Sequence, residues 1–405
     1  MEKPKIRFKG YQEDWEQRKL DDVAEFSKGS GYSKGDLIES GTPIILYGRL
    51  YTKYETIISD VDTFVEAKDG SVYSKGGEVI VPASGETAED IARAASVDKS
   101  GILLGGDLNV VMPNEDINSA FLAISISNGT SQRELARKAQ GKSVVHIHNE
   151  EIRNLVVLFP TKTEQNKIEN YFADLDQLIT LHQRKCEEMK TLKKYMLQKM
   201  FPQNGQSVPQ IRFSGFTEDW EQRKLGELSE KTFGGGTPKT SNESFWKGNI
   251  PWIQSSDLIE GSLFDVKPRK HISQEAVDKS ATKLVPENSV AIVTRVGVGK
   301  LVFMPFSYAT SQDFLSLSNL KTESQFTVYA LYKKLQSELN AVQGTSIKGV
   351  TKDELLAKEV TIPCYEEQEK IGSYLHSLDN LITLHQQKCD ELRNIKKFML
   401  QNMFI

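Results

Sequence analysis

A long stretch of this 405-residue chain occurs twice. Residues 171–201 read YFADLDQLITLHQRKCEEMKTLKKYMLQKMF, and residues 374–404 match 19 of these 31 positions at a constant offset of 203. A second repeat lies upstream, because IRFKGYQEDWEQRKL at 6–20 and IRFSGFTEDWEQRKL at 211–225 agree at 12 of 15 positions. A period near 200 residues is too long for a solenoid repeat. The fold must therefore contain two copies of one large unit.

Each copy of the longer repeat predicts one helix of about 35 residues, roughly 50 Å long at 1.5 Å per residue. Both copies lack Gly and Pro and are rich in good helix formers. Apolar positions alternate in steps of four and three, which is the seam of a coiled coil. Acidic residues gather near the start of the helix and basic residues near its end, so an antiparallel pair is complementary. The seam positions are Ile168, Phe172, Leu175, Ile179, His182, Cys186 and Met189, and then Ile371, Leu375, Leu378, Ile382, His385, Cys389 and Leu392.

The two blocks between the repeats share little sequence. Short β-branched runs between glycine-rich turns predict strands, and helices are expected at about 118–139 and 326–342. Each block closes on a proline and enters its long helix through a Glu-Gln pair, as helix starts do. The predicted strands lie at 43–47, 78–83, 102–104 and 108–113 in the first block and at 250–254, 289–294 and 300–306 in the second.

We predict an α+β fold with two globular domains, separated by an antiparallel coiled coil of two long helices and related by an internal pseudo-two-fold duplication. Each domain is expected to contain a mixed or antiparallel sheet. The predicted segments are an N-terminal arm at 1–20, a first domain at 21–160, a central helix at 161–201, a linker and repeated arm at 202–225, a second domain at 226–362 and a C-terminal helix at 363–405.

Composition sets few limits on function. No run of 18 apolar residues predicts a membrane span, and the opening MEKPKIRFKG has no apolar signal core. The three cysteines have no CxxC spacing, which favours a reducing cytoplasm. The net charge of −4 weakly disfavours nucleic-acid binding, but local patches decide that question.

Searches for catalytic motifs find none that holds. GVGK at 297–300 lacks the first Gly and the Ser or Thr of a phosphate-binding loop, so a strand–turn–strand is the better interpretation. GSGYSKG at 29–35 is a turn, and no DPPY-like methyltransferase tetrapeptide occurs. Asp62 with Glu66, Ala67 and Lys68 resembles a metal-nuclease pattern only loosely. We therefore predict no catalytic residue.

Two His-Cys pairs leave a metal site open as an alternative. His182 with Cys186, and His385 with Cys389, are each four residues apart on one helix face. Two His and two Cys are a possible zinc ligand set. All four occupy seam positions, however, where a small thiol and a packed imidazole are sufficient. Packing is the interpretation we adopt, with no bound metal.

The clearest binding signal is a mixture of basic, aromatic and amide residues in turns. Residues 267–300 contain seven Lys or Arg against three acids, and residues 131–143 contain four against one. Lys and Arg neutralise phosphates, whereas Arg, Gln, Asn, Ser and Thr can read base edges. Taken singly, each charge is equally a solvated surface group, and Trp246 or Trp252 a core anchor. The candidate DNA contacts are Lys34, Tyr47, Arg49, Tyr51, Lys53, Arg137, Lys138, Lys142, Lys239, Trp246, Lys247, Gln254, Arg269, Lys270, Arg295 and Lys348.

With these features assembled, the chain resembles the specificity (S) subunit of type I restriction–modification enzymes. The resemblance rests on the duplicated EDWEQRKL openings, the segment GGGTPKT…FWKGNIPWI…DL at 234–258, the twin P-x3-EQxxI helix starts and the repeated LITLHQ-x-KC-x-E helix. It covers essentially the whole chain.

This resemblance implies that the two blocks are target recognition domains, each reading one half of a bipartite, asymmetric DNA site. It also implies that the helices dock two modification (M) subunits, which use S-adenosylmethionine to methylate adenine, and through them two restriction (R) subunits, which use ATP and Mg. The S subunit itself then binds no cofactor, is not catalytic, and works in the bacterial cytoplasm at the nucleoid. The candidate docking residues are Trp15, Arg18, Leu175, Leu178, Trp220, Arg223, Leu378 and Leu381.

Two alternatives stay open from the sequence. One alternative to the specificity subunit is a DNA reader in another kind of methyltransferase assembly. The other is a coiled-coil scaffold whose globular domains bind protein without DNA specificity.

Overall fold

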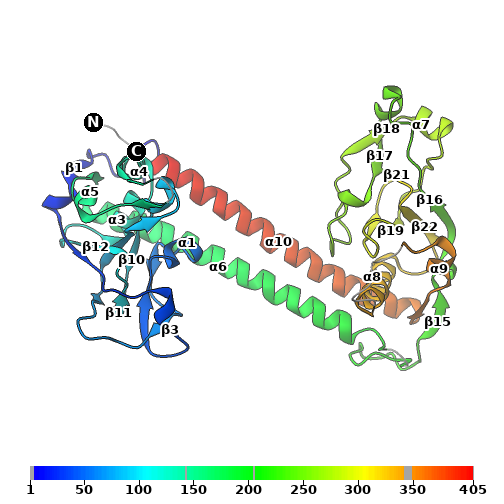
Figure 1. The fold of residues 1–405 in the computed structure, drawn as a ribbon. Helices are drawn as coiled ribbons and strands as arrows, with labels where there is room; N and C mark the ends of the chain where they lie inside the picture. Colours follow the sequence, from blue (N-terminus) through cyan, green and yellow to red (C-terminus); the bar gives the residue numbers. More distant parts are fainter. Residues whose placement is uncertain (1–3, 142–143, 204–205, 342–348, 405) are drawn as a thin grey trace. The chain divides into compact units, whose positions relative to one another are not determined.

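The computed structural model describes residues 4–141, 144–203, 206–341 and 349–404. The chain forms two compact units: unit 1 comprises Met1–Gln183 and Gln386–Ile405, and unit 2 comprises Arg184–His385. The long helices α6 (Lys162–Lys199) and α10 (Tyr365–Met403) each contribute residues to both units. Unit 1 therefore contains the start of α6 and the end of α10, and unit 2 contains the end of α6 and the start of α10 (Figure 1).

Unit 1 is built on two sheets with the strand orders β2-β12-β8-β10-β5 and β3-β6-β4-β11-β7. Both are mixed, because β10 pairs with β5 and β11 pairs with β4 in parallel. Two shorter pairs, β1 with β14 and β9 with β13, are antiparallel. The strands are β1 (Glu16–Lys19), β2 (Ala24–Lys28), β3 (Leu37–Ile38), β4 (Thr42–Ile45), β5 (Ile57–Ile58), β6 (Phe64–Val65), β7 (Tyr73–Lys75), β8 (Glu78–Pro82), β9 (Ser84–Gly85), β10 (Ala95–Val97), β11 (Ser100–Leu104), β12 (Leu108–Pro113), β13 (Val145–His146) and β14 (Val156–Phe159).

The main core of unit 1 lies where its helices cover the sheet strands β8 and β12 (Figure 1). Phe121 from α3, Leu135 from α4 and Phe172 from α6 are fully buried there, with Phe404 from beyond the end of α10 beside them. The shorter helices are α1 (Arg49–Thr52), α2 (Ala88–Ile91), α3 (Ser119–Ile126), α4 (Gly129–Lys138) and α5 (Asn149–Arg153).

Unit 2 repeats this plan with fewer strands. Its larger sheet has the order β16-β22-β19-β20 and is antiparallel, and a smaller sheet, β18-β17-β21, is mixed. A further pair, β15 with β23, is antiparallel in the manner of β1 with β14. The strands are β15 (Glu221–Lys224), β16 (Ser229–Gly234), β17 (Ile250–Ile253), β18 (Lys270–Ile272), β19 (Ser289–Val293), β20 (Leu301–Met304), β21 (Ala309–Thr310), β22 (Phe314–Leu320) and β23 (Glu359–Ile362).

The main core of unit 2 gathers around α8 (Ser324–Ala341). Phe326 and Tyr329 of α8 are fully buried beside Phe201, which follows α6, and Leu375 of α10. Two shorter helices complete the unit, α7 (Gln274–Lys279) and α9 (Lys352–Ala357).

The two long helices pack antiparallel within each unit, as the seam predicts. In unit 1 the thiol of Cys389 lies 3.6 Å from the Ile179 carbonyl oxygen, and Lys396 Nζ lies 2.6 Å from Asp176. In unit 2 Cys186 lies 3.9 Å from the Ile382 carbonyl oxygen, and Lys193 lies 2.5 Å from Asp379. Along these contacts the residue number decreases on α10 as it increases on α6, which is the pattern of an antiparallel pair. Along the predicted seam every side chain is buried or half-buried, which confirms the 3.5-residue pattern.

The other expectations about local structure are largely confirmed. All seven predicted strands occur, with boundaries that differ by at most two residues. The helix expected at 118–139 is wrong, because the segment forms two helices, α3 and α4. Gly129 at the junction has φ +66, a left-handed conformation that interrupts the helix. The second predicted helix corresponds to α8. The six segment boundaries stay predictions.

Candidate nucleic-acid interface

The start of each long helix is held by a buried ion pair within one unit, and the sequence analysis did not predict these pairs. Arg7 donates two hydrogen bonds of 2.7 Å to Glu164, near the start of α6, and Glu164 is fully buried. Arg212 donates two bonds of 2.8 Å to the equally buried Glu367 of α10. These bonds raise the pKa of both arginines. Bidentate pairs of this kind hold a fixed geometry. We call them the helix anchors.

A glutamine extends each helix anchor. Gln165 accepts a bond from the backbone N–H of Asn118 at 2.8 Å and donates to the Pro160 carbonyl at 2.9 Å. Gln368 makes the same bonds to Glu323 and Pro363, at 2.9 and 2.8 Å. The Glu-Gln pair is therefore more than a helix-start signal. It ties the helix to the sheet strand before it and to the helix α3 or α8 that it covers.

The repeated tryptophans of the EDWEQRKL motif lie in the cores. Trp15 packs edge-on against Phe121 and Phe404, and Trp220 packs in the same way against Phe201 and Phe326. Aromatic clusters of this kind contribute large buried areas. Trp15 therefore packs in unit 1 against the residue Phe404 that follows α10, and Trp220 packs in unit 2 against Phe201, which follows α6.

This burial narrows the predicted docking set. Trp15, Trp220, Leu175 and Leu378 are all less than 7% exposed, so their side chains are structural and cannot face a partner. Four members have exposed side chains, and we keep the docking prediction for these alone. They are Leu178 and Leu381, together with Arg18 and Arg223, which pair with Glu16 and Glu221 at 2.8 Å.

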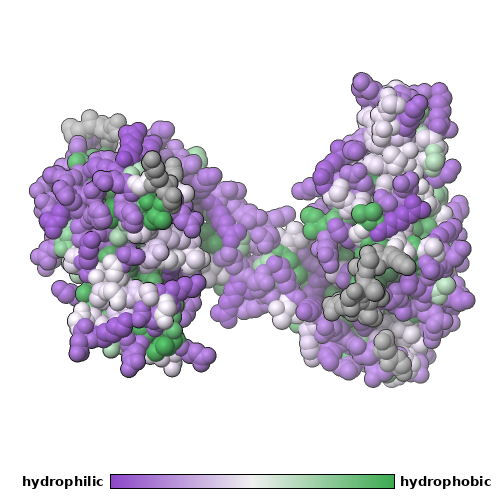
Figure 2. Space-filling view, in the orientation of Figure 1, coloured by the Kyte–Doolittle hydropathy of each residue, from purple (hydrophilic) through white to green (hydrophobic). Residues whose placement is uncertain are grey.

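Exposed leucines form a repeated feature of the two long helices. Leu178 and Leu181 of α6 are 43% and 47% exposed, and Leu381 and Leu384 of α10, at the offset of 203, are 41% and 58% exposed. A single exposed leucine on a soluble protein needs no explanation. Two exposed leucines recur at matching positions in both copies. We call these four residues the outer leucines. Figure 2 shows one face of each unit, which is mostly hydrophilic with scattered hydrophobic areas.

In unit 1, carboxylates hold several of the predicted DNA contacts. Arg49 is only 9% exposed and pairs with Glu55 and Asp62 at 2.7 Å. Lys53 also pairs with Asp62, and these two cations lower the pKa of Asp62 to about 2. Arg49 therefore stabilises its loop rather than facing a partner, which corrects the prediction for this residue. The pairing also explains Asp62 without a metal.

The remaining candidates of unit 1 divide into held and accessible side chains. Lys138 pairs with Glu134 at 3.0 Å, and the Tyr51 hydroxyl donates to the Ser84 carbonyl at 2.8 Å. Three candidates are exposed, Lys34, Tyr47 and Arg137, and no ion pair is found for either cation among the described residues. Lys142 lies outside the described residues, as does Lys348 of unit 2.

In unit 2 the tryptophan segment forms a small platform. Trp246 and Trp252 pack edge-on with centroids 5.0 Å apart, and Lys270 Nζ lies 5.5 and 5.6 Å from their rings. Trp252 is buried, as the core-anchor interpretation predicts, and Trp246 donates to the Lys239 carbonyl at 3.3 Å. These cation–π contacts orient the ammonium group of Lys270 toward the two rings. Lys239 itself is exposed.

Other polar candidates of unit 2 are held locally. Arg269 Nε lies 2.9 Å from the buried carboxylate of Asp257, and Lys247 pairs with Glu243 at 2.9 Å. Gln254 donates to the hydroxyl of Ser256 at 3.0 Å. These side chains lie at the surface, but each would have to exchange an existing partner to bind a phosphate.

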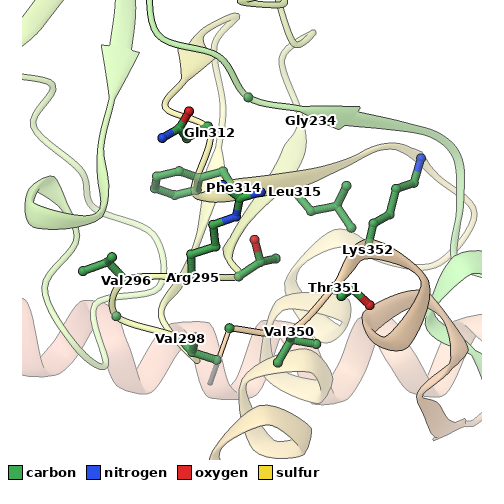
Figure 3. A pocket seen from close by; sticks show the side chains of 14 residues that line it. Gly234, Arg295, Val296, Val298, Gln312, Phe314, Leu315, Val350, Thr351 and Lys352 are labelled. Atoms are coloured by element: carbon green, nitrogen blue, oxygen red, sulfur yellow. The ribbon is translucent and has the colours of Figure 1, made fainter. Parts of the chain in front are cut away.

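Arg295 differs from these residues because it borders an open cleft of about 980 Å³ and has no hydrogen bond or ion pair among the described residues. Gln312 and Lys352 line the same cleft, and no described lining residue is acidic. Figure 3 shows Arg295 extending from the hairpin toward the part of the cleft that Gln312 and Phe314 line, with Lys352 at the other end. Neither Gln312 nor Lys352 was predicted from the sequence, because nothing in their neighbours marks them.

The cleft exists because of a glycine hairpin. Residues 294–300 connect the antiparallel strands β19 and β20, which confirms the strand–turn–strand interpretation of GVGK. Gly297 and Gly299 have φ of +88 and +94, which other residues adopt only with strain. Val296 at the tip is 71% exposed. The hairpin thus presents a cation and an apolar side chain together.

Comparison with known proteins identifies the family. A profile described as "Type I restriction modification DNA specificity domain" matches residues 12–191 and again 217–394. These matches span most of the chain, so the protein belongs to the family of type I restriction–modification specificity subunits.

Similar proteins agree with this assignment. A putative type I restriction enzyme MjaX specificity subunit from Methanocaldococcus jannaschii is 23% identical, over 95% of this chain and 91% of its own. The EcoR124I/EcoR124II specificity subunit from Escherichia coli is 30% identical over 40% of this chain and 41% of its own. The crystal structure of a type I S subunit from M. genitalium has a TM-score of 0.62 and 14% identity, covering 100% and 99% of the chains. This last likeness shows the shared fold.

Within the described residues, no group of three or more His, Cys, Asp and Glu side chains is arranged to hold a metal ion. Over the same part of the chain, no helix is long and apolar enough to cross a membrane.

Proposed function

We propose that each unit of this specificity subunit reads one half of a bipartite, asymmetric site in double-stranded DNA. The observation that carries the proposal is a repeated frame with unlike surfaces. The helix anchors and aromatic cores match between the units, whereas the loops and small sheets around them differ in length and in residue type. An asymmetric two-part site requires two readers of different sequence in one chain.

Local charge supports contact with DNA despite the net charge of −4. Accessible cations occur in both units, among them Lys34 and Arg137 in unit 1 and Arg295 and Lys352 in unit 2. Lys and Arg without a carboxylate partner lose little on binding phosphate and release counterions when they do so. The paired cations Lys53, Lys247 and Arg269 are weaker candidates for the same reason.

We propose further that the outer leucines dock two M subunits, one per copy of the repeat. A duplicated surface in a single chain offers two equivalent sites to two identical partners. Burying one leucine fully contributes about 1.5–3 kcal/mol. R subunits then join through the M subunits. Catalysis and the cofactors S-adenosylmethionine, ATP and Mg belong to these partners, a proposal that the failed search for catalytic motifs supports.

The proposed function also gives the long helices a role. A helix of 38 residues runs about 57 Å at 1.5 Å per residue. Readers that enter the major groove on one face of DNA sit about 34 Å apart or at multiples of this distance. Stiff antiparallel helices are suited to holding two readers at one such spacing. This function implies localisation in the bacterial cytoplasm, at the nucleoid.

Long-read sequencing of methylated adenines tests the proposal. A methylation-free host expressing this chain with its M subunit is expected to show one bipartite, asymmetric motif with a methylated adenine in each half. The M subunit alone, as the control, should leave no such motif. Complex formation without motif-specific methylation, and DNA binding that is absent or insensitive to salt, would favour the protein scaffold instead.

A further inference from the structure

The hairpin that carries Arg295 has a structural counterpart in unit 1. In unit 2 the N–H of Thr294 donates to the Asp313 carbonyl at 2.7 Å, and the N–H of Val350 donates to the Thr294 carbonyl at 2.7 Å. In unit 1 the N–H of Ala83 donates to the Asp107 carbonyl at 2.8 Å, and the N–H of Ile147 donates to the Ala83 carbonyl at 3.1 Å. Thr294 and Ala83 therefore occupy the same position. Both directly follow a central strand, β19 in unit 2 and β8 in unit 1.

A glycine beside this position confirms the equivalence. The N–H of Gly235 donates to the Phe314 carbonyl at 3.3 Å, and the N–H of Gly29 donates to the Leu108 carbonyl at 3.1 Å. A Cβ atom at Gly235 would lie 1.8 Å from the Ser311 carbonyl oxygen, and one at Gly29 would lie 1.9 Å from the carbonyl oxygen of Gly105. Both units need glycine here because two backbone segments approach closely.

The side chains mounted on this shared frame differ. Arg295 follows Thr294, and Ser84 follows Ala83 at the matching place. One residue before Val350 is Gly349, which lies against Arg295, since a Cβ there would be 3.6 Å from both Cα and Cγ of Arg295. The matching residue in unit 1 is His146, whose Nδ1 lies 3.1 Å from Ser84 Oγ.

A third position completes the comparison. Gln312 precedes Asp313 in unit 2, and Gly106 precedes Asp107 in unit 1. One unit thus presents a guanidinium and an amide, where the other presents a hydroxyl and an imidazole. Ser84 is half-buried, and Arg295, Gln312 and His146 are exposed. All four side chains can form hydrogen bonds with base edges.

We propose that this shared position is the base-reading site of each unit, formed by Arg295 and Gln312 in unit 2 and by Ser84 and His146 in unit 1. The proposal rests on the proposed function and names the residues that set specificity within it. Matching frames with unlike donors and acceptors are what two readers of different half-sites require.

The chemistry of unit 2 specifies what is read. Arg295 has only donors, and a guanidinium matches the O6 and N7 acceptors of guanine in the major groove. No described carboxylate competes for it. Gly349 leaves room for its stem, and the exposed Val296 beside it suits the methyl group of a thymine. Arg295 therefore reads a guanine in the half-site of unit 2.

The experiment uses the full complex of this chain with its M subunits, with adenine methylation mapped by long-read sequencing. Arg295→Ala is expected to lower discrimination at one G·C base pair of one half-site about tenfold to hundredfold, from about 1–3 kcal/mol per bidentate contact. Arg295→Lys should relax the same base pair, because lysine keeps the charge and loses the planar fork. The double variant Ser84→Ala with His146→Ala should relax the other half-site only.

Lys231→Ala is the control, because it removes an exposed cation of the same unit, on strand β16, that belongs to none of the proposed sites. Its motif should equal that of the wild type. An unchanged motif for Arg295→Ala, with the wild type methylating a bipartite site, would overturn this inference and leave the proposed function intact. So would a uniform loss of methylation at an unchanged motif, which marks a phosphate contact. A wild-type complex without a bipartite motif would instead overturn the proposed function.

Discussion

The two units share how they hold their helices and differ in what they present. Arg7 with Glu164, and Arg212 with Glu367, make the same bidentate bonds in both. After the central strand, however, unit 2 has a short glycine hairpin, whereas unit 1 has the β9–β13 pair and helix α2. A repeated interior with unlike loops and small sheets teaches that the surface of each unit can differ while the scaffold stays the same.

The largest effect is expected when one copy of the repeat is removed. In unit 1 the aromatic core is completed by Phe404, and Phe201 is its counterpart in the repeat. A fragment of residues 1–201 should therefore dimerise, each copy's Phe201 filling the place of Phe404 beside Trp15. With M subunits it should methylate a palindrome made of the first half-site twice. Analytical ultracentrifugation and methylation mapping check this, and a monomer or an asymmetric motif would count against it.

Breaking one helix anchor should affect one unit. Arg7→Ala leaves the fully buried Glu164 without its counter-charge, which costs about 3–5 kcal/mol of folding free energy. Hydrogen exchange should show lost protection in unit 1 after Arg7→Ala and in unit 2 after Arg212→Ala. Arg18→Ala, which breaks only an exposed pair with Glu16, is the control and should leave hydrogen exchange in both units unchanged, because exposed ion pairs stabilise a fold little. Equal loosening of both units by either variant would argue against independent anchors.

The outer leucines allow the two docking sites to be separated. Leu178→Asp with Leu181→Asp should weaken binding of one M subunit on the order of a hundredfold, since burial of two leucines is lost. Native mass spectrometry should then find one M subunit per chain. Gln177→Asp adds a charge to the same helix and should leave two. Retention of both M subunits in the double variant would place docking elsewhere.

The smallest expected effect concerns pH and unit 2. Burial lowers the pKa of Lys333 from 10.5 to about 8, although its ammonium donates to the carbonyls of Phe201 and Pro202. The unfolded chain then holds this proton more tightly than the folded chain, so this group makes stability rise between pH 8 and 10.5. Chemical unfolding at pH 7.5 and 9.5 should show that the free energy of unfolding of the wild type rises relative to that of Lys333→Met. A constant difference would show that the pKa is not lowered.

Much of the fold could be predicted because its signals are local or repeated. The 3.5-residue spacing of apolar residues determines the seam, and β-branched runs between glycines determine the strands. The break between α3 and α4 was not predicted, because a helix can contain a single Asn and Gly. The positive φ of Gly129 that ends the helical path is visible only in the structure.

The candidate site was harder to predict because its contacts join distant parts of the chain. Arg7 meets Glu164 across 157 positions, and no local pattern marks either as a partner. Arg49 and Arg295 are alike in the sequence, yet one is neutralised by two carboxylates and the other faces an open cleft. Ser84 matches Arg295 only through backbone hydrogen bonds, because unlike loops hide the alignment.

An exchange of one recognition block tests the central claim most directly. Residues 226–358 are replaced by the corresponding block of another family member, with both long helices retained, and the methylated motif is mapped in the complex with M subunits. Independent half-site readers predict that one half of the motif changes to the donor's half while the other half stays as it was. A change in both halves, or in neither, would contradict the account.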